Sequence, residues 1–368
     1  MIRVLHYLRH LGLGGTEKTC QLFFENASSD FEVVVAYERS GQHPRLPEFE
    51  KAAKVCGGSL VEIDSYSSFP NPNPSPINDL IGEWRPDILH VYRSGYAEFP
   101  ANMIYNTVDG RPEIVETNVF GHIDPAPCIK RTLFMSKWLM DHAIKGRAIP
   151  PHLSQRFHYV NNPVEEPYTD HKISGLSSDI IWLGRCGRPD NGIYNAVSVE
   201  AARLLRMQGY DVGFLVVAPP SNMVGDLAKY DIPFKMFEPT IDPLFLSQFY
   251  NSVDIYAHAR ADGETFGVNI AEAMMHGKPV VTHIATPSFT GMGVFQSQTE
   301  LVDDGKTGYI VNNDPGEYAE ALKKLIDSPK TREEMKWAAI VKAMTEYHVE
   351  VCQEKLERIY REVIDEQD

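Results

Sequence analysis

The sequence predicts an α/β protein made of two doubly wound, Rossmann-like domains. The chain has 368 residues, which is long for one domain and suits two domains of about 170 to 190 residues each. Its 43% hydrophobic and 23% charged residues are enough for two packed cores. Short apolar or β-branched runs recur along both halves at helix-sized intervals, which is the pattern of parallel sheets covered on both faces.

The first half contains seven such runs. We expect strands at 2–8, 31–37, 60–63, 87–92, 113–117, 131–135 and 157–160. The stretch 70–76 has proline at every second position, so it can form neither a helix interior nor a central strand. We interpret it as a surface loop within the first domain, because the strand pattern resumes after it.

The pattern breaks at Asn161-Asn-Pro163, and the polar segment up to Ser178 contains no run that could form a core. This segment is the predicted hinge, with a first domain at 1–165 and a second at 166–346. In the second half we expect strands at 179–183, 212–217, 234–237, 253–257, 280–283 and 309–311, with helices between them, including 196–208 and 243–251.

The C-terminal segment 338–366 is rich in charged residues and carries a partial apolar stripe at helical spacing. The sequence therefore predicts one long helix here. The apolar positions are Val341, Met344, Val351, Leu356, Ile359, Tyr360 and Val363.

The segment 253–283 is the most informative part of the chain. A strand is followed by a polar loop containing glycine, and from Phe266 the apolar positions recur at helical spacing until Gly277 and Pro279 end the helix. A second strand follows directly, so the segment predicts a strand–loop–helix–strand unit.

Two carboxylates flank the start of this helix. Glu264 precedes it and Glu272 lies two turns inside, roughly 12 Å away along the axis at 1.5 Å per residue. A nucleoside diphosphate sugar has hydroxyl-rich groups at both ends and two phosphates between them. If the phosphates rest on the N–H groups of Phe266, Gly267 and Val268, one carboxylate can meet the sugar and the other the ribose.

The segment Glu264-Thr-Phe-Gly-Val-Asn-Ile-Ala-Glu272, followed by Ala-Met-Met-His-Gly-Lys-Pro-Val-Val, resembles the E-x7-E signature of the GT4-like family. These are retaining glycosyltransferases of GT-B fold, also called glycosyl transferases group 1. The resemblance implies two Rossmann-like domains facing a central cleft, with the acceptor on the first domain and the nucleotide sugar on the second. It also implies that a final helix at about 347–368 packs back on the first domain. The alternative is an ordinary surface helix with solvated glutamates.

A glycine-rich turn follows the first strand, at Gly14, Gly15, Thr16 and Glu17. It lacks the spacing of a dinucleotide-binding turn and the ending of a P-loop. The resemblance implies that this turn faces the cleft on the acceptor side. The alternative is a plain helix start, at which Glu17 favours the helix dipole.

Departure of a diphosphate needs electrostatic stabilisation. Arg185, at the end of a predicted strand, matches an arginine of the family, so the resemblance implies a phosphate contact there. The family usually carries a lysine several residues later, but here Asn191 or Ile193 occupies that region. Arg188 is an extra cation nearby, and we expect it to replace the missing charge. The alternative for either arginine is a solvated loop residue.

The resemblance places a cleft-facing histidine after the predicted strand 113–117, and His122 matches it as a contact to the transferred sugar. Asp124 is a weaker candidate. His90 and Tyr92 end another predicted strand and could contact an acceptor, although His90 could equally be a core histidine. Weaker matches to the family are Ser136, Lys137, Glu300 and the loop 286–298 with Gly291 and Gly293.

Charge and composition exclude several other classes. A net charge of −15 argues against nucleic-acid binding, which needs clustered Lys and Arg. The 13 histidines and 5 cysteines show no metal-ligand spacing, so we expect neither a metal site nor a cofactor other than the donor substrate. Scattered cysteines and the lack of a leader or an apolar span predict a cytoplasmic protein. Membrane contact remains open, because acceptors in the family are often lipid-linked, and so does the oligomeric state.

The sequence thus predicts a retaining, metal-independent glycosyltransferase that moves a hexose from a UDP- or GDP-sugar to a carbohydrate or glycolipid-type acceptor. Glu264, His122 and Arg185 are the predicted catalytic residues. The alternatives are a non-catalytic sugar-nucleotide-binding or assembly subunit and a nucleotide-sugar epimerase of GT-B fold.

Overall fold

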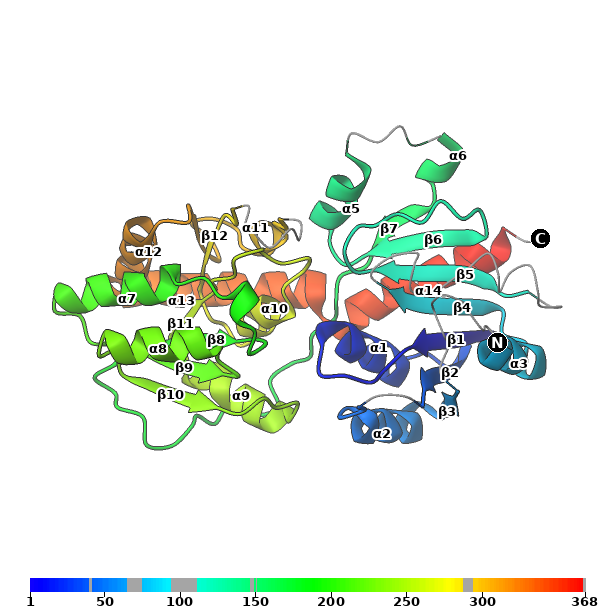
Figure 1. Cartoon of the computed structure of the whole chain (residues 1–368), viewed down its shortest axis with the longest axis horizontal. Coiled ribbons are helices and arrows are strands. Elements are labelled where there is room, and N and C mark those ends of the chain that lie inside the picture. The colour runs from blue at the N-terminus through cyan, green and yellow to red at the C-terminus, as the bar shows by residue number, and fades with distance from the viewer. Residues whose placement is uncertain are drawn as a thin grey trace. The chain divides into compact units, whose positions relative to one another are not determined.

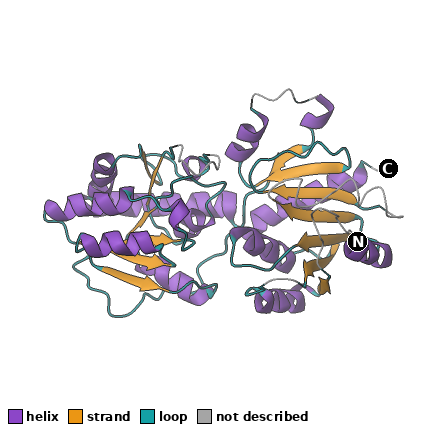
Figure 2. Cartoon of the chain, viewed as in Figure 1, coloured by secondary structure: helices purple, strands orange, loops and turns teal. Residues whose placement is uncertain are grey.

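The computed structural model describes residues 1–39, 42–64, 75–93, 111–145, 149, 151–286 and 294–366. The chain divides into two compact units, each a parallel sheet flanked by helices (Figures 1 and 2). The first unit is Met1–Pro163 with Val349–Asp368, and the second is Val164–His348. The predicted loop 70–76 falls largely outside the described residues, as do positions 287–293 of the loop 286–298, with Gly291 and Gly293.

The sheet of the first unit has seven parallel strands in the order β3-β2-β1-β4-β5-β6-β7. All seven predicted strands are present, within two residues at each end. They are β1 (Ile2–Leu8), β2 (Phe31–Glu38), β3 (Ser59–Ile63), β4 (Ile88–Arg93), β5 (Glu113–Asn118), β6 (Ile129–Phe134) and β7 (Phe157–Tyr159).

Successive residues of β1 bury opposite faces of this sheet. Val4 and Leu8 join one core cluster, whereas Leu5 and Tyr7 join another. Both faces are therefore covered, as the apolar runs predict. The helices of the unit are α1 (Gly15–Glu25), α2 (Leu46–Cys56), α3 (Ser75–Trp84), α5 (Lys137–Ile144), α6 (Pro151–Ser154) and α14 (Val349–Asp365).

The second unit has a six-stranded parallel sheet in the order β10-β9-β8-β11-β12-β13. Its strands are β8 (Ile181–Cys186), β9 (Val212–Val217), β10 (Phe234–Phe237), β11 (Ile255–Ala257), β12 (Val280–His283) and β13 (Gly308–Val311). Its helices are α7 (Val197–Met207), α8 (Ser221–Lys229), α9 (Pro243–Ser252), α10 (Val268–Met275), α11 (Gln298–Leu301), α12 (Pro315–Asp327) and α13 (Pro329–Lys342). The predicted α/β class with two Rossmann-like domains is confirmed.

The prediction of one helix over 338–366 is wrong. Helix α13 ends at Lys342, a π-helical turn follows at Ala343–Tyr347, and α14 begins only at Val349. Between them His348 has an extended backbone (φ −58°, ψ 142°) and forms an isolated bridge with Val164. The apolar spacing runs through the break without interruption, so the pattern alone could not reveal it.

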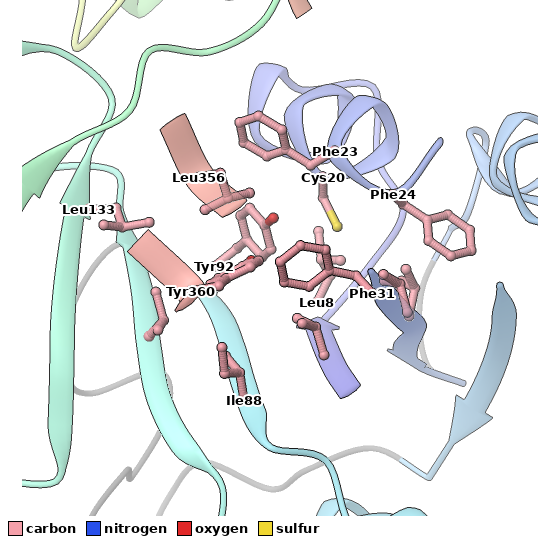
Figure 3. Close-up of a cluster of buried hydrophobic side chains, with 14 of the residues drawn as sticks. Leu8, Cys20, Phe23, Phe24, Phe31, Ile88, Tyr92, Leu133, Leu356 and Tyr360 are labelled. Atoms are coloured by element: carbon pink, nitrogen blue, oxygen red, sulfur yellow. The ribbon is translucent and has the colours of Figure 1, made fainter. Parts of the chain in front are cut away.

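Helix α14 belongs to the first unit. Its buried residues Leu356 and Tyr360 lie in one core cluster with Phe23 of α1 and Leu133 of β6 (Figure 3). Burial of each such side chain contributes roughly 1.5 to 3 kcal/mol. The C-terminal end of the chain is therefore an integral part of the first unit. Among the described residues, none of the helices combines the length and apolar character needed to cross a membrane.

Candidate functional site

The end of β8 and the start of α10 are fastened together in the second unit. The Asn269 side-chain amide of α10 donates to the carbonyl of Cys186 at 2.7 Å. The Tyr256 hydroxyl, on β11, lies 3.1 Å from both the backbone nitrogen and the carbonyl of Cys186. Because carboxyl ends of parallel strands share one edge of a sheet, Arg185 on β8 and the loop after β11 meet there.

The guanidinium of Arg185 is only partly hydrogen-bonded by the described residues. The residue is only 7% exposed, and its Nη2 reaches the carbonyl of Arg188 at 3.5 Å. Its Nη1 is buried and has no hydrogen-bond partner among the described residues. Burial lowers the pKa of the Arg185 guanidinium. A buried donor without a partner is costly, so this geometry suits an anionic ligand that supplies the missing acceptor.

The start of α10, which is bonded to the end of β8 beside Arg185, presents backbone N–H groups. Gly267 is the N-cap, with φ at 103°, a left-handed conformation that favours glycine. The first N–H groups of a helix have no intrahelical partner, so the predicted phosphate contacts Phe266, Gly267 and Val268 lie at a helix N-terminus. The Phe266 ring is buried and packs edge-on against Tyr347, with centroids 5.5 Å apart.

Glu264 precedes this helix start and is held by two neighbours. Its Oε1 lies 3.2 Å from His258 Nε2, and its Oε2 lies 3.3 Å from Arg260 Nη1. Burial of the carboxyl acts to raise its pKa, but the Arg260 charge and the His258 hydrogen bond outweigh it, so the pKa lies below its usual range. The carboxylate is thus ionised near neutral pH and can accept hydrogen bonds from hydroxyl groups.

Glu272 lies further along α10. It is half-buried, and its Oε2 accepts a hydrogen bond from the Tyr250 hydroxyl at 2.7 Å. Burial and the neighbouring Glu272 raise the pKa of Tyr250 well above its ordinary value, so the phenol keeps its proton and donates. One carboxylate, Glu264, therefore precedes α10 and the other, Glu272, lies within it, as the sequence predicts.

The structure also describes residues 188–193, the region in which the family usually carries a lysine. Arg188 is exposed, and its charge contributes to lowering the pKa of Glu264. The Asn191 side chain donates to Ser221 Oγ at 2.9 Å and accepts from the Asn222 backbone at 3.0 Å. Ile193 is buried at 3% exposure. Of these positions, only Arg188 places a cation near Glu264.

Sequence reasoning missed the support around Glu264. Besides His258 and Arg260, the Gln298 side chain accepts the Glu264 N–H at 3.0 Å. Ser297 donates its backbone N–H to the Glu264 carbonyl at 3.0 Å. The string of charged and polar residues in the loop 258–264 was the available signal, but the partner segment 294–298 is distant in the sequence.

In the first unit, Gly14 is the N-cap of α1, and Gly15 and Thr16 form its first turn. The Glu17 carboxylate folds back toward the turn, and its Oε1 lies 3.0 Å from His10 Nε2. A Cβ on Gly14 would lie 2.5 Å from Glu17 Oε2, so glycine gives the carboxylate its room. Glu17 thus has a defined place at the carboxyl end of β1.

His122 is exposed in the loop after β5, and its carbonyl accepts from the Asn118 side chain at 2.8 Å. Asp124 is engaged elsewhere: its Oδ2 lies 2.7 Å from Arg93 Nη2, and its carbonyl accepts from Arg156 at 2.6 Å. The buried cluster of Arg93, Asp124, Arg156 and Glu116 is a structural network, so Asp124 does not stand as a site candidate.

His90 is a core histidine. It is fully buried, its Nδ1 contacts the Tyr360 hydroxyl of α14, and its Nε2 lies 2.8 Å from Thr117 Oγ1. Tyr92 is buried beside it, with the two rings stacked at 4.5 Å. Ser136 is likewise structural, because its hydroxyl accepts the Leu139 N–H at 3.0 Å and caps α5. Lys137 is exposed and pairs with Asp141.

Glu300, the remaining candidate of the second unit, lies in α11, where its carbonyl accepts from Lys342 Nζ at 2.8 Å. In the part of the chain that the structure describes, no group of three or more His, Cys, Asp or Glu could hold a metal ion.

Part of the chain is similar to a known protein family. Residues 177–328 match the model of glycosyl transferases group 1. The chain is 30% identical over 110 residues to a D-inositol 3-phosphate glycosyltransferase of Thermomonospora curvata, a match covering 30% of this chain and 23% of that protein. It is 26% identical over 194 residues to a phosphatidyl-myo-inositol mannosyltransferase of Mycobacterium leprae, covering 51% of this chain and 47% of that protein. The matches thus span less than half the length of either relative.

Solved structures match over nearly the whole chain. A glycosyltransferase from Rickettsia africae has a TM-score of 0.77 at 15% identity, covering 99% of this chain and 98% of that one. Anabaena Alr3699/HepE, solved in complex with UDP and glucose, has a TM-score of 0.72 at 14% identity, covering 98% and 100%. At such identities the likeness shows the fold alone, and that fold is GT-B. The chain thus has the GT-B fold, and within its second unit residues 177–328 are similar to the glycosyl transferases group 1 family.

Proposed function

We propose that this protein is a retaining, metal-independent glycosyltransferase that moves a hexose from a UDP- or GDP-sugar to a carbohydrate or lipid-linked acceptor. The observation that carries the proposal is the buried Arg185, whose Nη1 has no partner among the described residues and which is fastened through Cys186 to the α10 N-terminus. A diphosphate has the charge and the acceptor oxygens to satisfy both elements.

In this proposal the donor lies along the start of α10. Its diphosphate accepts hydrogen bonds from Arg185 and from the N–H groups of residues 266–268, with Arg188 replacing the family's lysine. Glu264 accepts from the sugar hydroxyls, and Glu272 accepts from the ribose diol. Glu264 is ionised and already bonded at both oxygens, which supports an acceptor role rather than that of a covalent nucleophile.

Transfer breaks the bond between the anomeric carbon and the diphosphate oxygen and forms a bond from that carbon to an acceptor oxygen. The nucleoside diphosphate leaves with the bonding electron pair, and the acceptor hydroxyl gives its proton to the departing diphosphate oxygen. Charge grows on the leaving diphosphate, so Arg185 and the helix N–H groups stabilise the transition state more than the bound donor.

The first unit supplies the acceptor side in this proposal, through Gly14, Gly15, Thr16, Glu17 and His122. Two observations support it: Glu17 has a defined place at the carboxyl end of β1, and His122 is exposed beyond β5. The names of the two curated relatives specify D-inositol 3-phosphate and phosphatidyl-myo-inositol, which supports a polyol or lipid-linked acceptor. The complex of Alr3699/HepE with UDP and glucose supports a UDP-sugar donor.

The second candidate is a non-catalytic member that binds sugar nucleotides. The observation that favours it is that neither residue in the region of the family's lysine is a cation. Asn191 donates to Ser221 of α8, and Ile193 is buried. The cytoplasmic location remains a prediction from the cysteine pattern.

The test is a thermal-shift screen against UDP, GDP, ADP and their hexose conjugates, with EDTA present. A ligand bound only by the folded state raises the melting temperature according to its concentration over its dissociation constant. We expect one base to raise it, and Glu272→Ala to abolish the rise. Glu320→Ala, at an exposed position of α12, is the matched control and keeps the rise.

A second measurement distinguishes enzyme from binding protein. We expect slow release of free hexose from the donor that the screen identifies, because water can replace the acceptor. A rise in melting temperature without any hydrolysis or transfer would favour the non-catalytic candidate. No rise with any nucleotide would contradict the donor site itself.

A further inference from the structure

We propose that His258 and Arg260 are positioning residues for Glu264, with His258 fixing the direction of one carboxylate oxygen and Arg260 supplying the cation beside the other. The inference rests on the proposed function, in which Glu264 meets the transferred sugar. It adds the residues that give this carboxylate its orientation and keep it ionised.

The geometry of the carboxylate is fully specified by these two neighbours. Oε1 faces His258 Nε2 at 3.2 Å, and Oε2 faces Arg260 Nη1 at 3.3 Å. The exposed fractions are 13% for the Glu264 side chain, 4% for His258 and 19% for Arg260. Each oxygen keeps lone-pair capacity for a further hydrogen bond. The directions in which the two oxygens can accept hydrogen bonds from a sugar hydroxyl are therefore fixed before the sugar binds.

His258 projects from a rigid part of the sheet. It follows β11, its backbone N–H donates to the Val281 carbonyl at 2.9 Å, and its own carbonyl lies 3.1 Å from the Tyr318 hydroxyl. Its Nδ1 lies 2.8 Å from Thr282 Oγ1 on β12. The ring is thus held by its own backbone and by a neighbouring strand.

These contacts assign the tautomer of His258. An ionised Glu264 is only an acceptor, so His258 Nε2 must carry the hydrogen and donate it. In the neutral ring Nδ1 is then an acceptor, and the Thr282 hydroxyl donates to it. Glu264 therefore selects the tautomer, and Thr282 supplies the hydrogen that the other ring nitrogen then accepts.

Arg260 is aimed by its other contacts. Its Nε and Nη2 lie 2.6 and 3.1 Å from the two oxygens of Asp262, which leaves Nη1 directed at Glu264. Its backbone N–H lies 3.3 Å from His283 Nε2. Burial lowers the pKa of His283 to about 4, so that ring is neutral and can accept this hydrogen.

The charged groups around Glu264 come from three segments. Burial of the carboxyl favours its protonated form, and the cations oppose this. Removal of Arg260 therefore moves the protonation of Glu264 to higher pH. The groups that face Glu264 or Arg260 are His258, Arg260, Asp262 and His283 around the strands β11 and β12, with Arg185, Arg188 and Asp190 from β8 and the loop after it.

The experiment compares Arg260→Met with the conservative Arg260→Lys in the full chain. The dissociation constants of UDP, GDP and their hexose conjugates are measured by calorimetry from about pH 4.5 to 8.5. We expect Arg260→Met to weaken conjugate binding several-fold at the acid end of this range. We also expect the acid limb of binding to move to higher pH, because Glu264 loses the cation that favours its ionised form. The lysine variant restores most of the affinity, and the nucleoside diphosphate at pH 7.5 binds as before.

A second pair tests His258 without touching it. Thr282→Val removes the hydroxyl that holds the His258 ring at Nδ1, and we expect a several-fold loss of conjugate affinity, which Thr282→Ser restores. Valine has nearly the shape of threonine and serine keeps the hydroxyl, so this pair decides the question even if Arg260→Met does not fold.

The outcomes separate the two claims. A wild-type protein that binds no nucleotide sugar overturns the proposed function, and this inference with it. If the wild type binds, an unmoved acid limb in Arg260→Met, or equal weakening of diphosphate and conjugate, overturns the inference alone. Equal affinities of the valine and serine variants of Thr282 overturn the part played by His258.

Discussion

The side-chain amide of Asn269 donates to the backbone carbonyl of Cys186 across 2.7 Å. This single hydrogen bond joins the first turn of α10 to the end of β8, and so joins the helix N–H groups to Arg185. Neither element could hold a diphosphate as well alone, because one offers partial positive charge and the other a full cation. Their relative position is therefore set before any ligand binds.

Asn269→Ala removes this connection. We expect the free energy of unfolding of the second unit to fall by about 1 kcal/mol, the typical net value of one hydrogen bond. We also expect the dissociation constant for the nucleotide to rise several-fold, because Arg185 and the helix start are no longer held together. Urea unfolding and calorimetry measure the two effects.

The matched control is Asn313→Ala. Asn313 is exposed and follows β13. Its side-chain oxygen accepts from Asn195 at 3.0 Å, and its side-chain nitrogen donates to Thr286 at 3.2 Å, both within the second unit. The control should leave nucleotide affinity unchanged. If both variants weaken binding alike, the Asn269 bond has no special part in organising the site.

Arg185→Met separates stability from binding. A buried cation without a full set of partners destabilises the free protein, and burial indeed lowers the pKa of this guanidinium. We therefore expect Arg185→Met to leave the melting temperature of the free protein unchanged or higher, while the shift caused by the nucleotide disappears. Differential scanning fluorimetry with and without nucleotide measures both quantities.

Arg188→Met is the companion variant. Because Arg188 is exposed, the free protein should keep its melting temperature, and the loss of nucleotide affinity reports how far Arg188 replaces the absent lysine.

A large drop in the free protein's stability in Arg185→Met would contradict our interpretation, since it would assign Arg185 a structural role.

The sequence predicted the sheets well for a physical reason. Strands buried on both faces are near-continuous apolar runs, so β2, β9 and the other strands were recognisable without knowledge of their partners. The helix start at 266–268 was also local, because Gly267 and the apolar spacing after it mark it directly. Such features depend on neighbours within a few residues.

The missed features depend on contacts across the chain. His90 could not be placed from sequence, because its partner Tyr360 is 270 positions away. The segment holding Glu264 was hidden for a similar reason. Gly263 has φ at 70°, and a Cβ there would lie 1.8 Å from the Phe295 carbonyl oxygen, so the glycine lets 294–298 run against the loop. Only the fold brings these segments together.

The buried histidines of the first unit predict a dependence of its stability on pH. Burial lowers the pKa of His6 to about 3, and burial with the nearby His6 lowers the pKa of His90 well below its usual value. In the unfolded chain both rings titrate near 6.5. Below that pH the unfolded state binds protons that the folded state does not, so stability is lost as the pH falls from about 6.5 toward 3.

We expect each histidine to remove about 1.4 kcal/mol per pH unit within this window. His6→Gln should clearly reduce the loss between about pH 6 and 5, where few carboxyl groups titrate. His90 and His158, whose pKa burial also lowers, account for what remains. Hydrogen exchange of β1 and β4 at the two pH values measures it within the first unit. His171→Gln, whose side chain is 80% exposed, is the control and should keep the wild-type slope. Equal slopes for His6→Gln and the wild type would mean that His6 takes up its proton without opening the core, contrary to the burial of its ring.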